Sequence, residues 1–226
     1  MKDLIDTTEM YLKTVYELLE EGVPPLRARI AERLGHSGPT VSQTVARMER
    51  DGLLTVDEDR IIRLSDEGFA KASDVMRKHR LAERLLIDVI GLEWELVHDE
   101  ACRWEHVMSD TVEAKLLGIL DSSGTDPYGN PIPEVGADPA VAAGVGLLPL
   151  TEIKGEDEQH VTVARIGEPL QVDIELLTRF TEAGVLPGAE ITVSEQDGIH
   201  VVGATNSDVV LEVPDNISRS IFVKRR

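Results

Sequence analysis

The chain has 226 residues, 42% of them hydrophobic, and carries a formal net charge of −19 at pH 7. A chain of this length forms one to three domains, and it contains no run of about 18 apolar residues that could cross a membrane. Cys102 is the only cysteine, which excludes disulfides within the chain, and residues 1–6 show no secretory signal pattern, so a cytoplasmic protein is expected.

Positive charge is concentrated in one segment despite the acidic total. Residues 26–50 contain five arginine and two glutamate side chains. A local basic face on an acidic chain can still bind phosphates, while the surplus acid elsewhere discourages non-specific binding and attracts cations. DNA-reading and metal-binding residues are therefore the functional features to look for.

Apolar residues recur at helical spacing through the first fifty residues. The pattern predicts a first helix that ends at Gly22, a second over 26–34, and a third over 37–51. Two short apolar runs follow within 53–64, separated by four charged residues, which is the pattern of a β-hairpin. A helix pair with a tight turn, followed directly by a hairpin, is the element order of a winged helix-turn-helix.

The second helix of such a pair enters the major groove of DNA, so its outward side chains carry the information. Val41, Val45 and Met48 are spaced to face inward, which turns Gln43 outward, where an amide can bond adenine edges. The side chains expected to contact bases, phosphates or the minor groove are Arg27, Arg29, Ser37, Pro39, Thr40, Gln43, Thr44, Arg47, Arg50 and Arg60. An ordinary helical subdomain with a solvated polar face is the alternative interpretation.

Two further helices and a strand-rich segment complete the expected elements. A long helix capped by Ser65 ends near Gly91, and another covers roughly 95–120. The segment 121–150 is rich in Gly, Pro, Ser and Ala and is expected to be a loop followed by a linker. A short helix is expected near Asp173–Ala183. The expected strands of a small β-barrel are Val161–Ile166, Glu190–Val193, Ile199–Val202, Val209–Val213 and Ile221–Val223.

Potential metal ligands cluster in the expected helix over 95–120. His98, Cys102, Glu105 and His106 fall on one helical stripe, so a thiolate, a carboxylate and imidazoles can reach one cation. The pair His79 and Glu83 is one turn apart on the preceding helix, and antiparallel packing would bring it to His98, which predicts a second site. Met10 is a further soft donor. Taken singly, each of these side chains also fits a core or surface role.

At these motifs the chain resembles the diphtheria toxin repressor and iron-dependent regulator family, over nearly all of its length. The most similar stretches are Asp6–Leu12, Pro25–Leu34, Ser37–Gly52, Met76–Leu86 and Val97–Asp110. The resemblance implies a mainly α chain with a C-terminal β part. It places a winged helix-turn-helix DNA-binding domain at 1–73, a helical metal-binding and dimerisation domain at 74–140, a linker at about 134–147, and an SH3-like domain at 148–226.

The same resemblance implies two metal sites. It forms a primary, activating site from Met10, Cys102, Glu105 and His106. It forms an ancillary site from His79, Glu83 and His98, completed by an acidic and an amide side chain of the third domain. Glu168 and Gln171 have the spacing of that acidic and amide pair.

The function expected from these features is that of a homodimeric repressor, not an enzyme, which binds operator DNA when loaded with Fe(II) and controls iron homeostasis genes. Soft Cys102 and Met10 favour Fe(II) over Mn(II), and Co(II), Ni(II), Zn(II) or Mn(II) are expected to substitute in vitro. The alternatives are a Mn(II)-responsive repressor, a metalloenzyme with an open coordination position, and a regulator that senses an organic ligand. Whether one or two dimers occupy an operator stays open.

Overall fold

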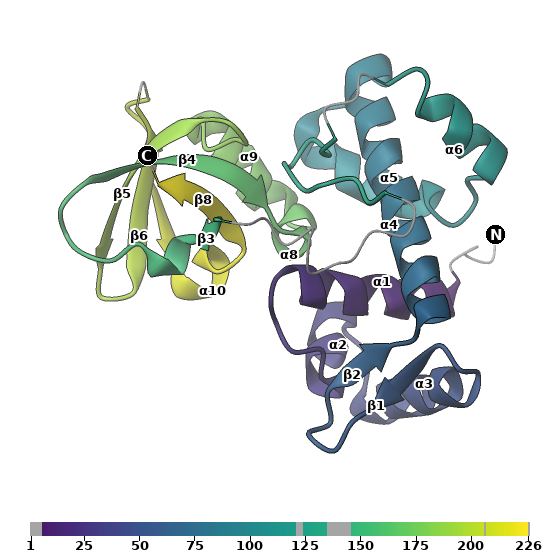
Figure 1. Ribbon diagram of the computed structural model, residues 1–226. Coiled ribbons are helices and arrows are strands. Elements are labelled where there is room, and N and C mark those ends of the chain that lie inside the picture. The colour runs from purple at the N-terminus through teal and green to yellow at the C-terminus, as the bar shows by residue number, and fades with distance from the viewer. Residues whose placement is uncertain (1–5, 121–123, 135–145, 206, 226) are drawn as a thin grey trace. The chain divides into compact units, whose positions relative to one another are not determined.

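A computed structural model describes residues 6–120, 124–134, 146–205 and 207–225 (Figure 1). The chain divides into two compact units, and each is described by itself. The first unit comprises Met1–Ala82, Ala101–Asp121 and Ile132–Ala143, and the second comprises Glu83–Glu100, Ser122–Pro131 and Gly144–Arg226. Most of the expected linker at 134–147 lies outside the described residues.

Helices dominate the chain up to residue 116, and strands dominate from residue 148 onward, which confirms the predicted fold class. The elements before residue 120 are α1 (Thr7–Glu20), α2 (Arg27–Leu34), α3 (Gly38–Arg50), β1 (Leu54–Val56), β2 (Ile62–Leu64), α4 (Asp66–Leu85), η1 (Leu86–Ile90), η2 (Trp94–Leu96), α5 (Val97–Trp104) and α6 (Asp110–Leu116). The later elements are β3 (Leu148–Pro149), η3 (Leu150–Glu152), β4 (Gln159–Ile166), α8 (Glu168–Gln171), α9 (Ile174–Ala183), β5 (Glu190–Gln196), β6 (Ile199–Ala204), β7 (Leu211–Pro214), α10 (Asp215–Ser218) and β8 (Ile221–Arg225).

The helix pair α2–α3 has the sequence signals that its ends require. α2 ends at Gly35, which adopts a left-handed conformation (φ 63°) that glycine reaches without strain. The side chain of Ser37 accepts a hydrogen bond from the backbone N–H of Thr40, and Pro39 occupies the first turn of α3. The inward side chains of α3 join α1 in one apolar core. The tight turn therefore fixes the direction of α3.

The strands β1 and β2 pair antiparallel immediately after α3 and form the predicted hairpin. The register places Leu54 opposite Leu64 and Val56 opposite Ile62. Arg60, at the tip between the strands, has a positive φ of 65°, so its backbone adopts the conformation that a tight turn needs. The order of helix, turn, helix and hairpin is the winged helix-turn-helix that the sequence predicts (Figure 1).

The single helix predicted over 95–120 is wrong, because the chain leaves the helical path after Trp104. α5 ends there, and α6 begins only at Asp110, where the Ser109 side chain accepts a hydrogen bond from Val112 N–H and caps the new helix. Glu105 and His106 consequently lie in the turn after α5 and not on a continuous helical stripe. The long helix before it does reach Gly91, through a π-helical turn over Leu86–Ile90.

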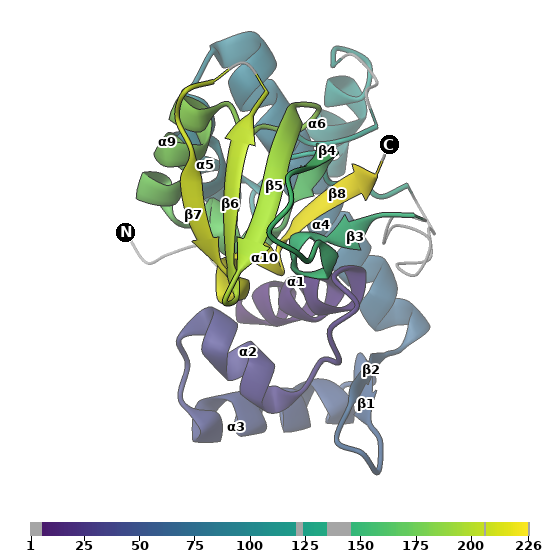
Figure 2. The ribbon, with the colours of Figure 1, turned by 90° about the vertical axis from the view of Figure 1, so that its left-hand side faces the viewer.

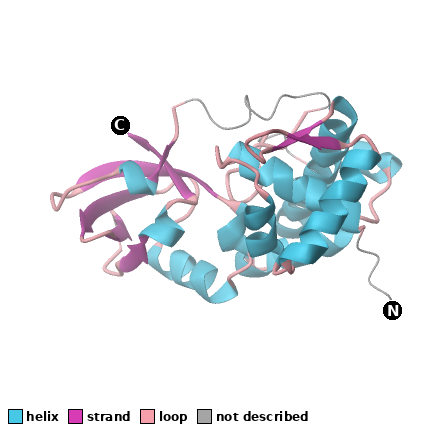
Figure 3. Ribbon diagram, turned by 90° about the horizontal axis from the view of Figure 1, so that it is seen from below, coloured by secondary structure: helices cyan, strands magenta, loops and turns pink. Residues whose placement is uncertain are grey.

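The second unit is built on a six-stranded antiparallel sheet with the order β3-β8-β4-β5-β6-β7 (Figure 2). Strands are magenta in Figure 3. Its five longer strands match the predicted ones, whereas the two-residue strand β3 was not expected. The short helix predicted near Asp173–Ala183 is α9, and the Asp173 side chain caps it by accepting a hydrogen bond from Leu176 N–H. One apolar core contains side chains from the sheet, from α9 and from Tyr128, and this core positions the loop at 124–131 beside Ile166.

Candidate DNA-reading face and metal-binding clusters

α3 presents a continuous polar face to solvent. Val41, Val45 and Met48 are buried, as the spacing predicted. The exposed side chains of the cap and helix are Ser37, Pro39, Thr40, Ser42, Gln43, Ala46, Arg47, Glu49 and Arg50, and Thr44 is half-buried. The structure therefore places the predicted base-reading residues outward and adds Ser42 and Ala46, which sequence reasoning omitted although they lie on the same turns. Among the residues that the structure describes, none of these exposed side chains belongs to the apolar core of the first unit.

Two of the arginines expected to contact phosphates, Arg29 and Arg50, form exposed ion pairs with acidic side chains. Nη1 of Arg29 lies 3.0 Å from Oε2 of Glu32, and Nη2 of Arg50 lies 3.2 Å from Oδ1 of Asp51. Arg60 is exposed at the hairpin tip, and Arg27 is half-buried. Exposed ion pairs of this kind contribute at most about 1 kcal/mol, so a phosphate can replace the carboxylate at little cost.

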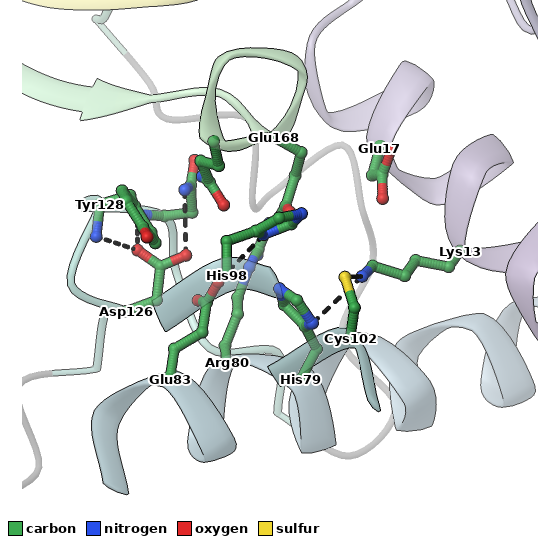
Figure 4. Close-up of polar contacts among 12 residues, drawn as sticks. Lys13, Glu17, His79, Arg80, Glu83, His98, Cys102, Asp126, Tyr128 and Glu168 are labelled. Atoms are coloured by element: carbon green, nitrogen blue, oxygen red, sulfur yellow. Dashed lines mark hydrogen bonds and ion pairs between the residues drawn. The ribbon is translucent and has the colours of Figure 1, made fainter. Parts of the chain in front are cut away.

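Buried polar side chains of the first unit meet at Glu105. Its Oε2 lies 2.8 Å from Nζ of Lys13 on α1 and 2.6 Å from Nδ1 of His79 on α4. The same ammonium lies 3.8 Å from Sγ of Cys102 (Figure 4). A cation therefore already stands between a thiol and a carboxylate, and this donor set suits a soft or borderline divalent metal.

His106 joins this cluster to the start of α1. Its Nε2 lies 3.2 Å from Oε1 of Glu105, and its Nδ1 lies 2.7 Å from Oε2 of Glu9. Met10, the next residue on α1, is half-buried against the apolar core of the first unit. The structure thus brings Glu105 and His106 together, while the participation of Met10 in a metal site stays a prediction.

The ionisation of Glu105 is controlled by its neighbours. Burial alone would raise its pKa, but the charges and hydrogen bonds of Lys13 and His79 outweigh burial and lower the pKa of Glu105 to about 2. Glu105 is therefore a carboxylate throughout the physiological range, which is the protonation state that a metal ligand requires.

The second unit contains a separate group of buried ionisable side chains. Nδ1 of His98 lies 3.3 Å from Oε1 of Glu83 and 3.5 Å from Oε2 of Glu168 (Figure 4). All three side chains are at most 5% exposed. Two carboxylates that face one imidazole suit a divalent cation. His79, one turn before Glu83 on α4, lies in the first unit, so its membership of this group stays a prediction.

Gln171 supplies an unused acceptor in the second unit. Its Nε2 donates to the carbonyl of Ile166 at 2.8 Å, which fixes the amide, and the side chain is 1% exposed. Its Oε1 is buried and has no hydrogen-bond donor within the described residues. A buried acceptor without a donor costs about 1–3 kcal/mol, and a bound cation would remove that cost. The amide of Gln171 therefore fits a metal site.

The loop at 124–131 shares a hydrogen-bond acceptor with Gln171, the carbonyl of Ile166. Asp126 accepts hydrogen bonds from the backbone N–H groups of Tyr128 and Asn130, both at 2.8 Å. The Asn130 amide donates to the same Ile166 carbonyl at 3.0 Å. Burial, followed by the charge of Glu83, raises the pKa of Tyr128, so its phenol stays neutral and donates to the carbonyl of Trp94 at 2.8 Å.

A third acidic group in the first unit already has cationic partners. Asp74, Asp110 and Glu113 have carboxylate oxygens within 4.8 Å of one another. Nζ of Lys78 lies 2.7 Å from Asp74 and 2.9 Å from Asp110, and Arg77 pairs with Glu113. These lysine and arginine charges neutralise the carboxylates, so this group is a salt-bridge network that ties α4 to α6.

Two residues in the first cluster were missed by sequence reasoning. Only the structure reveals the contact of Glu9 with His106. Nothing in the sequence indicated it, because the helix dipole already accounts for an acidic residue in the first turn of a helix. Lys13 lies one turn after Met10 on α1, and this spacing could have placed it near the expected metal ligands. Lysine is normally a surface residue, so the spacing alone did not single it out. Its burial depends on the packing of α1 against the turn after α5.

The models of three protein domains match the chain in sequence. They are the iron dependent repressor N-terminal DNA binding domain (residues 3–62), the iron dependent repressor metal binding and dimerisation domain (65–134), and the diphtheria toxin repressor SH3 domain (148–225). Together with the fold, they define a metal-dependent DNA-binding regulator. The chain belongs to the iron-dependent repressor family, which includes the diphtheria toxin repressor.

Full-length relatives and solved structures agree with this assignment. The chain is 52% identical over 229 residues to the iron-dependent repressor IdeR of Mycobacterium leprae, with both chains fully covered. It is 49% identical over 227 residues to the diphtheria toxin repressor of Corynebacterium diphtheriae, with 99% of each covered. Among solved structures, a manganese-dependent transcriptional repressor in complex with manganese has a TM-score of 0.80 at 27% identity, covering 97% of this chain and all of that one. IdeR of T. acidophilum has a TM-score of 0.77 at 25% identity, covering 98% and 99%.

The described helices also bear on membrane insertion. Within the described ranges, no helix is both long and apolar enough to cross a bilayer.

Proposed function

We propose that this protein is an Fe(II)-activated transcriptional repressor of the cytoplasm, which binds operator DNA as a homodimer. The observation that carries the proposal is the set of contacts that α1 makes with the end of α5 and with the turn after it. Glu9 contacts His106, and Lys13 contacts Glu105 and Cys102. The side chains suited to a metal therefore lie against the same helix that packs into the core with α3.

The primary metal would be held by Met10, Cys102, Glu105 and His106. The ancillary metal would be held by His79, Glu83, His98, Glu168 and Gln171. A bound Fe(II) would bring two positive charges, where the Lys13 ammonium brings one, and would favour one arrangement of these ligands over others. The link to the DNA-reading helix would come from α1, because α1 carries Met10 and also packs against the core side chains of α2 and α3. Ligand geometry and the direction of the reading helix are thereby linked.

DNA recognition is assigned to α3 and the hairpin. Ser37, Pro39, Thr40, Gln43 and Thr44 would meet base edges, while Arg27, Arg29, Arg47, Arg50 and Arg60 would contact the phosphates or the minor groove. The exposed ion pairs of Arg29 with Glu32 and of Arg50 with Asp51 are weak enough to be exchanged for phosphates. Domain boundaries at 1–73, 74–140 and 148–226 are part of this proposal.

A homodimer is supported by apolar side chains that the first unit leaves exposed. Val107, Val112, Leu117 and Ile119 are each 49–65% exposed within and around α6. They lie inside the segment that matches a dimerisation domain. Apolar patches of this kind mark protein contacts, and an isologous dimer would present two reading helices to a pseudo-palindromic site.

Iron is favoured over manganese by the donor set and by the relatives. The thiol of Cys102 is a soft ligand, whereas Mn(II) prefers oxygen. The relatives named for iron are 52% identical over the whole chain, while the manganese-named structures are 24–27% identical. A Mn(II)-responsive repressor is the second candidate, since those structures share the fold.

The experiment is an anaerobic selection of genomic fragments by the purified protein with Fe(II), with Mn(II), and with a chelator. We expect enrichment of pseudo-palindromic fragments with Fe(II), weaker enrichment with Mn(II) at equal concentration, and none with the chelator. Equal enrichment with the chelator would exclude metal activation, and stronger enrichment with Mn(II) would establish the second candidate.

A further inference from the structure

The ammonium group of Lys13 is buried among residues that the proposed function assigns to metal. The residue is 5% exposed, and its Nζ lies 2.8 Å from Oε2 of Glu105. The same Nζ lies 3.1 Å from Nδ1 of His79 and 3.8 Å from Sγ of Cys102 (Figure 4). Lysine is almost never this buried unless it is paired. Its partners are therefore what hold the charge inside the first unit.

We propose that Lys13 is a built-in competitor of the metal at Cys102 and Glu105, and that it sets the metal concentration at which the protein becomes loaded. The inference rests on the proposed function, because it takes Cys102 and Glu105 as ligands. In the metal-free protein the ammonium neutralises Glu105. A divalent cation on the same carboxylate and thiolate must move the ammonium away, since two cations at this distance repel strongly in a buried site.

The alternative is that Lys13 has a structural role and holds α1 against the rest of the first unit. Another ion pair already joins α1 to α4. Arg80 on α4 forms two hydrogen bonds with Glu20 on α1, at 2.9 and 2.6 Å, and both residues are buried. That pair joins α1 to α4 with the bidentate geometry typical of structural ion pairs. Lys13 instead directs a single charge at a carboxylate oxygen and a thiol, which are groups that a metal also uses.

The two roles predict opposite effects of removing the charge. If Lys13 competes, only the fraction of molecules with the ammonium displaced can bind metal, and the apparent affinity is reduced by that fraction. Lys13→Met, which keeps the aliphatic stem, then binds metal more tightly. If Lys13 only positions Glu105, the same substitution weakens metal binding because the carboxylate loses its support.

The test is a titration with Co(II), whose thiolate charge-transfer absorption reports coordination by Cys102. Wild type, Lys13→Met and Lys71→Met are compared without DNA. Lys71 is an exposed lysine of α4 that pairs with Glu67 at 3.5 Å, so its variant loses the same charge at the surface. We expect the Co(II) dissociation constant of Lys13→Met to fall by about tenfold, as for a competent fraction of about one in ten, and that of Lys71→Met to stay unchanged.

A thermal melt with and without Co(II) provides a second readout. Lys13→Met should melt at a lower temperature than wild type without metal, because Glu105 has lost its counter-ion, and should gain more from Co(II). Unchanged or weaker Co(II) binding by Lys13→Met would overturn the inference while leaving the proposed function intact. Absence of the thiolate absorption in wild type would instead contradict the proposed metal site itself.

If Lys13→Met does not fold, displacement of the Lys13 ammonium can be tested in the wild-type protein by measuring the reactivity of its lysine amines. Acetylation of Lys13, followed by mass spectrometry, should be slow without metal and several-fold faster with saturating Co(II), since the amine leaves its buried partners. Lys71 serves as the internal reference, with one rate in both conditions. Equal rates for Lys13 with and without Co(II) would contradict displacement.

Discussion

Nδ1 of His106 lies 2.7 Å from Oε2 of Glu9, although 97 residues separate the two in the sequence. Glu9 is in the first turn of α1, and His106 follows α5 directly. The contact joins the helix that supports the DNA-reading pair to the segment richest in soft metal donors. If His106 binds the metal as proposed, any rearrangement of its imidazole would act on α1 through this charge-assisted hydrogen bond, which is stronger than a neutral one.

Cys102→Ala should fold and dimerise but fail to bind operator DNA at a metal concentration that activates wild type. The substitution removes the softest ligand of the proposed primary site, and Cys102 is only half-buried, so little packing is lost. Operator binding is measured against Fe(II) concentration, with the unfolding midpoint of the metal-free protein as the control. An activation curve that superimposes on the wild-type curve would remove Cys102 from the mechanism.

Gln43→Ala should weaken binding to the operator by about 1–3 kcal/mol and relax its sequence preference, because an exposed amide on α3 would lose its base contacts. Arg47→Ala should weaken binding to all sequences more evenly and reduce the dependence on salt. Gln196→Ala and Arg179→Ala, two exposed residues of the second unit, are the matched controls. Unchanged affinity and preference in Gln43→Ala would show that α3 does not read the groove.

The double substitution Glu168→Ala with Gln171→Ala should lower the number or affinity of metal ions per protomer and raise the metal concentration for half-maximal DNA binding. Activation should still be reached, because the primary site is untouched. Calorimetric metal titration and an operator gel-shift measure the two quantities. Glu158→Ala with Gln159→Ala, an acid and an amide in the same unit, is the control. Identical stoichiometry and midpoint in both double variants would leave the second unit without a metal role.

Tyr16→Phe should stabilise the protein at pH 7 by about 1 kcal/mol, because the buried hydroxyl of Tyr16 has no hydrogen-bond partner within the described residues. The ring stacks on Phe69, a contact that phenylalanine keeps. Tyr11→Phe is the opposite control, since the Tyr11 hydroxyl lies 2.9 Å from Nδ1 of His36 and its loss should destabilise. Urea unfolding of the metal-free protein distinguishes the two; destabilisation by Tyr16→Phe would mean that the hydroxyl has a partner.

The same residue predicts a loss of stability in alkali. Burial, and then the charge of Glu20, raise the pKa of Tyr16 from 10.0 to about 12. The unfolded chain releases the phenol proton near pH 10 while the folded chain retains it, so this contribution is lost as pH rises from 10 through 12. This difference between the pKa values of Tyr16 in the unfolded and folded chains corresponds to about 2–3 kcal/mol. Tyr16→Phe should lack this part of the decline, and an identical decline in both proteins would contradict the assignment.

Local signals predicted the elements, and tertiary packing determined the site. The cap at Ser37, the glycine at Gly35 and the paired apolar runs specify the winged helix-turn-helix within about thirty residues, so its geometry follows from short-range rules. The break after Trp104 was also encoded locally, in the Ser109 cap. The prediction rested on periodicity and did not use that cap, so it placed Glu105 and His106 on the wrong element.

The burial of Lys13 could not be predicted from sequence. Its partner Glu105 is 92 residues away, and a lysine on an amphipathic helix is ordinarily solvated. The orphan oxygen of Gln171 depends in the same way on the Ile166 carbonyl that fixes its amide. Residue types therefore indicated that metals bind, whereas the competing charge and the unused acceptor depend on contacts between distant segments.

The most direct measurement is the affinity of the purified protein for a selected operator duplex, by fluorescence anisotropy under anaerobic conditions, with saturating Fe(II) and with excess chelator. Coupling between metal and DNA sites is typically about 5–150-fold in affinity. We predict that Fe(II) tightens operator binding within or above this range, that a scrambled duplex shows no such gain, and that chelator reverses it. Equal operator affinity with Fe(II) and with chelator would contradict metal activation.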